Sequence, residues 1–187
     1  MKHIIPFVLL ILLAKGLSAQ NSTDIFEACR AGDLATVKAL QNINADTLNS
    51  VDYKGYTPLI LAVYNDQPEV VAYLLTQKVN TDAQDQSGNT ALMGAVFKGY
   101  QQHVKILLEN GTSVDQQNYN AATALTFAAT FGGPEIVKLL LEHNANVNIK
   151  DARGYTAIDH AKMQGNTAVV EVFDAYIGNK NSTDGKK

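Results

Sequence analysis

Apolar residues recur along this chain in short blocks separated by polar turns, and the blocks return at a fixed interval. One threonine opens each block: Thr57, Thr90, Thr123 and Thr156. A set of valines has the same spacing: Val71, Val104, Val137 and Val170. So does a set of turn residues: Asp52, Asp85, Asn118 and Asp151. Four copies in one register, with a period of about 33 residues, indicate a repeat protein in which each unit covers the apolar face of the next.

Within each unit the residue pattern predicts two helices. Each threonine precedes an apolar stretch, where its hydroxyl can accept a hydrogen bond from a free amide of the first helical turn. Pro58 stands just inside that start, and Pro68 and Pro134 open the second helix, because proline has its φ already set for a helix. Gly111 and Asn144 suit a left-handed helix end. Triplets such as 104, 107 and 108 place apolar side chains at helical spacing.

The repeats are expected to fill residues 20–176, with worn copies at both ends acting as caps. Asp174 stands where the other copies have a leucine, as expected for an outward-facing last helix. The polar tail 177–187 is expected to be disordered. The predicted repeats are about 22–51, 52–84, 85–117, 118–150 and 151–176.

Residues 1–19 are predicted to be a secretory signal peptide. Lys2 is followed by an unbroken apolar run from Ile4 to Ala14, and cleavage is expected after Ala19. Leu17 is large for its position before the cleavage point, so a site one position away stays open. A bilayer-spanning helix needs roughly 20 apolar residues, and the run is shorter, which makes a permanent anchor the weaker interpretation. A periplasmic or secreted protein is expected, the alternative being an uncleaved apolar tail on a cytosolic one.

Composition and charge narrow the classes of partner. The 187 residues carry a net charge of −3, and without Lys2 and Lys15 of the predicted signal peptide there are 13 basic against 18 acidic residues, or −5. This balance argues against nucleic acid or an anionic membrane as the main partner. With one cysteine, Cys29, the chain can form neither an intramolecular disulfide nor a thiolate zinc site. Cys29 aligns with Val63, which predicts a buried packing role.

The repeat unit resembles the ankyrin repeat, a β-turn followed by two antiparallel helices. Residues 52–59, Asp-Tyr-Lys-Gly-Tyr-Thr-Pro-Leu, follow the start of the family pattern, and residues 140–148 follow its end with Asn144 for glycine. The resemblance covers about 22–176. It implies an all-α ankyrin-repeat solenoid of about five stacked helix-turn-helix repeats with short β-turn or hairpin connections. With the predicted signal peptide, the chain resembles exported bacterial members of the family.

The sequence carries no recognisable motif for catalysis or for a cofactor. The sequence has no glycine-rich phosphate loop and no Gly-x-Ser-x-Gly. His103, His143 and His160 fall on three repeats at unrelated positions, so structural roles are favoured over a metal site. Asp159 and His160 are adjacent, but Asp159 is expected to bond nearby turn backbone. We therefore expect no enzyme activity, no cofactor and no metal.

The resemblance also implies where a partner binds, because ankyrin repeats usually recognise proteins with their turn tips and first-helix face, which line a concave groove. We call ten of the matching positions the turn–helix row: Tyr53, Tyr56, Tyr64, Asn89, Phe97, Lys98, Tyr119, Phe131, Arg153 and Tyr155. Aromatic side chains dominate the row, and such residues at solvent-facing positions favour a binding site. The alternative is that the rings pack against adjacent turns and stiffen the stack. Ala121 replaces the turn glycine of the fourth copy, so that tip is expected to deviate.

These observations predict a monomeric, non-enzymatic module for protein–protein interaction, without nucleic acid or a membrane anchor after cleavage. Some periplasmic ankyrin proteins that this chain resembles support a peroxide-defence enzyme such as catalase, whereas others neutralise a toxin. The alternative function is a structural scaffold of the cell envelope without a single client. A hydrolase has almost no support from the residues.

Overall fold

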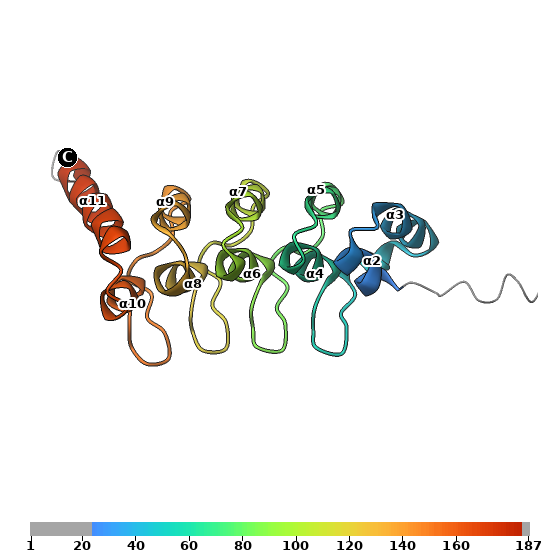
Figure 1. Cartoon of the computed structure of the whole chain (residues 1–187), viewed down its shortest axis with the longest axis horizontal. Coiled ribbons are helices and arrows are strands. Elements are labelled where there is room, and N and C mark those ends of the chain that lie inside the picture. The colour runs from blue at the N-terminus through green and yellow to red at the C-terminus, as the bar shows by residue number, and fades with distance from the viewer. Residues whose placement is uncertain (1–23, 185–187) are drawn as a thin grey trace, which may run out of the picture.

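The computed structural model describes residues 24–184, which form five stacked helix pairs (Figure 1). The first helices of the pairs are α2 (Ile25–Ala31), α4 (Pro58–Tyr64), α6 (Ala91–Lys98), α8 (Ala124–Phe131) and α10 (Ala157–Met163). The second helices are α3 (Leu34–Ile43), α5 (Pro68–Thr76), α7 (Gln101–Glu109), α9 (Pro134–Glu142) and α11 (Thr167–Asp184). A short 3₁₀ helix, η1 (Ala45–Asn49), follows α3. The predicted all-α solenoid of about five pairs is confirmed, whereas the predicted signal peptide lies outside the described residues.

The predicted helix starts are present. Thr57 Oγ1 accepts a hydrogen bond from the Ile60 amide at 3.2 Å, and Thr90, Thr123 and Thr156 cap α6, α8 and α10 in the same way. The prolines at the starts of α4, α5 and α9 occupy the first turn. These local signals fix where each helix begins.

Packing between neighbouring pairs builds a continuous core. Each first helix packs against the first helix of the next pair, and each second helix against the next second helix, so Figure 1 shows two rows of helices. In α7, Val104 and Leu107 are fully buried, and Phe173 of α11 closes the end of the core. Burial of each such side chain contributes about 1.5–3 kcal/mol, which no single pair could obtain alone.

The turns between pairs extend beyond the row of first helices (Figure 1) and form a hydrogen-bonded ladder. The Gln86 amide donates to the Lys54 carbonyl at 3.1 Å, and Tyr119 and Ala152 repeat this contact one and two turns later. A second ladder, absent from the sequence expectations, uses side chains: Asp82 Oδ1 accepts from the Ser113 amide at 2.8 Å. Asn49 and Asp115 do the same for the neighbouring repeats. Successive turn tips are therefore held side by side.

Two expectations about local structure were wrong. Ala121 adopts a left-handed φ of 55°, close to the 77° of Gly55, so the fourth tip keeps the shape of the others. Its turn bond from the Ala121 amide to the Asn118 carbonyl is retained at 2.8 Å. The tail predicted from residue 177 is helical through Asp184, because the packed start of α11 supplies the nucleus and extension costs less than nucleation.

Within residues 24–184, no helix combines the length and the apolar character that crossing a bilayer demands.

Candidate partner-binding face

The turn–helix row presents large side chains to solvent, as predicted. Tyr53 is 80% exposed, Tyr119 71% and Phe131 61%, and the remaining exposed aromatics of the row are Tyr64, Phe97 and Tyr155. Because the turns and the first helices both stack, row residues of successive repeats are neighbours. Together they form an apolar surface of a kind that monomeric proteins usually reserve for binding.

Tyr56 and Asn89 differ from the other members of the row. The ring of Tyr56 is half-buried against the hydrophobic core. Asn89 is also half-buried, and its Oδ1 accepts a hydrogen bond from Asn118 Nδ2 at 2.9 Å. At these two positions the contacts fit a role in stiffening the stack better than a role in binding a partner.

The ring of Tyr64 packs closely against a glycine of the next repeat. A Cβ atom added at Gly94 would lie only 3.0 Å from two ring carbons of Tyr64, so the missing side chain makes room for the ring. Lys98 Nζ lies 5.6 Å from the centre of the same ring, within the range of a cation–π contact. The phenol is therefore a preorganised platform with a cation beside it.

Three phenylalanine rings lie on the next two first helices, α6 and α8. The Phe97 and Phe131 rings meet edge to face with their centroids 5.4 Å apart, which connects α6 to α8. Phe127, one turn earlier in α8, lies 6.2 Å from Phe131. Both outer rings, Phe97 and Phe131, remain exposed despite these contacts. Mutual packing of the rings therefore accounts for their orientation but leaves their outer faces open.

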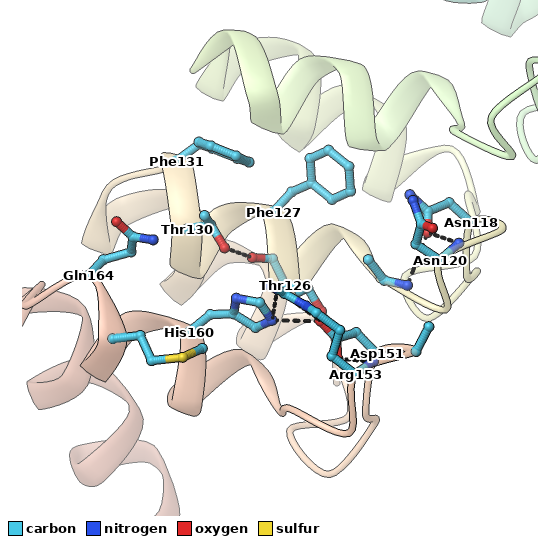
Figure 2. A pocket seen from close by; sticks show the side chains of 13 residues that line it. Asn118, Asn120, Thr126, Phe127, Thr130, Phe131, Asp151, Arg153, His160 and Gln164 are labelled. Atoms are coloured by element: carbon cyan, nitrogen blue, oxygen red, sulfur yellow. Dashed lines mark hydrogen bonds and ion pairs between the residues drawn. The ribbon is translucent and has the colours of Figure 1, made fainter.

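A pocket of about 530 Å³ lies between α8, α10 and the turns that precede these two helices (Figure 2). Phe127, Phe131 and Met163 supply apolar surface, and Asn120, Arg153 and Gln164 are among the polar lining residues. Figure 2 shows the two phenyl rings on one side, with His160, Asp151 and Arg153 on the other. The volume falls within the range of roughly 300–1,000 Å³ typical of ligand sites.

The polar side of the pocket is organised around one buried carboxylate. Asp151 Oδ2 lies 2.9 Å from Nε2 of the buried His160, and Arg153 Nη2 approaches the same oxygen at 3.3 Å. Asp151 Oδ1 accepts from the amides of Arg153 and Tyr155. Burial alone would raise the pKa of Asp151, but the hydrogen bonds from Tyr155, His160 and Arg153 outweigh it and lower the pKa to about 2. The carboxylate therefore stays charged at any physiological pH.

The other titratable side chains that could carry chemistry are engaged in structural contacts or buried. Asp159, the other acidic residue next to His160, accepts from Thr156 in a capping box and so bonds turn backbone, as expected. The thiol of Cys29 is buried in α2, where burial raises its pKa to about 12 despite the opposing charge of Arg30. In the described part of the chain, no three His, Cys, Asp or Glu residues are grouped to hold a metal ion. A charged, hydrogen-bonding wall facing an apolar one suits binding of a mixed-polarity group.

Position in the repeat places Met163, Gln164 and Asn120 on this face, but the sequence prediction overlooked Phe127 and the pairing of His160. A signal for Phe127 was available, because Gly94, Phe127 and His160 are separated from one another by the repeat period. These three positions are equivalent in the repeat and follow one another beneath the turn–helix row. The partner of His160 is not a neighbour in the sequence, and only the folded turn reveals it.

Comparison with known proteins supports the repeat architecture. A family model described as ankyrin repeats (3 copies) matches residues 25–118, and a second, ankyrin repeats (many copies), matches residues 107–161. No curated protein matches the chain.

Proposed function

The chain belongs to the ankyrin repeat family, and on this premise we propose that it acts in the periplasm as a non-enzymatic binding module. Its turn–helix row holds a protein partner. Ankyrin repeats in general suggest protein–protein interaction and are typically binding modules without enzyme activity. The partner, the compartment and the surface used are the parts of the proposal that go beyond family membership.

The observation that carries the proposal is the exposure of Tyr64, Phe97 and Phe131 on three successive first helices, with the last two rings in edge-to-face contact. Exposed rings of this size are costly in water unless a partner covers them, and tyrosine is enriched in the residues that dominate binding energy. The ring of Tyr64 already packs against Gly94 and Lys98, which lowers the entropy lost on binding.

The periplasmic location rests on the sequence of residues 1–19, with its basic start, apolar run and small residue before the expected cleavage point. In that compartment we infer two classes of client: a stress-defence enzyme such as catalase, or a toxin that the module neutralises. Deletion of the gene is expected to cause peroxide sensitivity in the first case and poisoning by sister cells in the second.

Affinity capture from the envelope fraction of the native cell, followed by mass spectrometry, tests the proposal. The wild-type chain should retain one dominant protein, and Tyr64→Ala with Phe97→Ala should lose it. A matched control, Lys105→Ala with Lys138→Ala on the exposed sides of α7 and α9, should retain it. Weak capture of many proteins that neither pair of substitutions changes would favour a cell-envelope scaffold instead.

A further inference from the structure

We infer that the partner segment recognised by this face is acidic and carries a large apolar side chain that enters the pocket between α8 and α10. This inference rests on the proposed function and adds to it the chemistry of the bound segment. Two independent features of the face lead to it, namely the composition of the pocket and the sign of the exposed charges around it.

The pocket is built for an anchor that is apolar on one side. The Phe127 and Phe131 rings and the exposed Met163 side chain offer ring faces, ring edges and a flexible thioether. Aromatic side chains pack well against such groups in edge-to-face or sulfur contacts. The opposite wall can accept a polar tip, because Nδ1 of His160 makes no hydrogen bond within the described residues while Nε2 is held by Asp151. A tryptophan or tyrosine ring satisfies both walls.

The charges on the face are mostly positive. The charged side chains of the matching turn-tip and helix-end positions in the second to fifth repeats are Lys54, Lys98 and Arg153, all of them exposed, on a chain whose net charge is −3, whereas the exposed carboxylate of Asp66, just after α4, is already engaged by His103. The turn carboxylates beneath them are buried or half-buried, and each accepts amide hydrogen bonds within its own turn, as Asp85 does from Ser87 and Asn89. A partner approaching the tips therefore meets cations, which favours an acidic segment.

Arg153 connects the two features because it lines the pocket and remains 67% exposed. Its Nε and Nη2 are held by Asp151 at 3.3 Å, which fixes the guanidinium plane and leaves Nη1 for another acceptor. Arginine presents its donors in a rigid fork that suits carboxylates. A partner carboxylate close in sequence to the anchoring ring would reach this group, and acidic residues farther along would reach Lys98 and Lys54.

The test is selection of random dodecapeptides displayed on phage against the immobilised full chain. Enriched peptides are expected to contain an aromatic residue with Asp or Glu nearby. Their affinity, measured by fluorescence anisotropy on synthetic copies, should fall at least about tenfold in Arg153→Glu and in Lys98→Glu. The charge-matched control Lys138→Glu on α9 should bind as the wild type does. Because Arg153 also contacts Asp151, Lys98→Glu keeps the test valid if Arg153→Glu alters the last turn.

The inference is overturned if no peptides are enriched, if the enriched peptides are basic or lack an apolar anchor, or if Lys138→Glu weakens them as much as Arg153→Glu does. Tighter binding of a short single-stranded DNA than of the selected peptides would overturn it as well, by assigning the cations to a phosphate backbone. Failure of the inference is distinguishable from failure of the proposed function. If Tyr64→Ala with Phe97→Ala still abolishes capture of the natural partner while both charge reversals leave that capture intact, only the inference falls.

Discussion

The imidazole Nε2 of His160 lies 2.9 Å from Oδ2 of Asp151, and this contact connects α10, the first helix of the last pair, to the turn that precedes it. In the previous repeat the equivalent positions hold Phe127 and Asn118, so the His–Asp contact is not repeated there and the aromatic ring stands one layer away. This difference between two adjacent repeats gives the pocket one charged wall and one apolar wall. The same difference makes the last turn dependent on pH.

Asp151→Asn should destabilise the last repeat at neutral pH and have little effect in acid. Asn118 already shows that an amide oxygen keeps the two amide bonds of the turn, each at 3.0 Å, so the variant keeps those bonds and loses the charge together with the acceptor Oδ2 that faces His160 and Arg153. Because the pKa of Asp151 in the fold is lowered to about 2, its contribution is full above the unfolded pKa of about 4 and is lost as pH falls through about 2.

Urea unfolding at pH 7, 5 and 3 measures this contribution. We expect a loss of about 1 kcal/mol at pH 7, with the difference from wild type shrinking at the lowest pH. Asp174→Asn on the exposed side of α11 is the control. An equal loss at every pH would show that the charge of Asp151 does not stabilise the turn.

Leu107→Ala should cost ~2–5 kcal/mol, because Leu107 is fully buried between stacked pairs and the core cannot collapse completely around the void. The melting temperature in a calorimetric scan reports the loss, with Lys105→Ala on the exposed side of α7 as the control. Unchanged melting of Leu107→Ala would contradict the stacked core.

Substitutions at two turn tips should have opposite effects on stability. A Cβ atom at Gly88, whose φ is 78°, would lie 2.6 Å from the Tyr119 backbone nitrogen, so Gly88→Ala should destabilise through both strain and collision. Ala121 already has a φ of 55°, and Ala121→Gly should relieve about 1 kcal/mol of left-handed strain. The greater freedom of glycine in the unfolded chain offsets part of that gain. Melting temperatures should therefore rise slightly for Ala121→Gly, and a fall would show that the tip is not strained.

Cys29 should resist thiol reagents in the folded protein. Its side chain is fully buried, and burial raises the pKa of the thiol to about 12 despite the nearby charge of Arg30. Labelling with a maleimide at pH 8 should be slow in buffer and complete within minutes in denaturant. Rapid labelling of the folded chain would indicate local opening of the first pair.

Periodic and local signals predicted most of the fold. The threonine caps, the prolines at helix starts and the left-handed Asn144 each act within one turn of helix, so the repeat spacing was sufficient to place them. The prediction of a disordered tail from residue 177 was wrong, because polarity alone does not end a helix that has already been nucleated by packing.

Contacts that cross between repeats were less predictable. The prediction of the candidate face identified exposed rings, since exposure follows from position in the repeat. It could not predict the edge-to-face contact of Phe97 with Phe131 or the packing of the Tyr64 ring against Gly94, because these contacts depend on the distance between successive layers. The Asp66 contact with His103, at 2.9 Å, likewise joins residues of different repeats.

The most direct test of the account is calorimetric titration of the captured partner with three forms of the chain. Tyr64→Ala with Phe97→Ala is predicted to raise Kd at least about tenfold, while Lys105→Ala with Lys138→Ala leaves Kd unchanged and all three forms keep the helical signal of the wild type. Wild-type affinity in the first variant, with weakened binding in the second, would contradict the account and assign the partner to the face formed by the second helices.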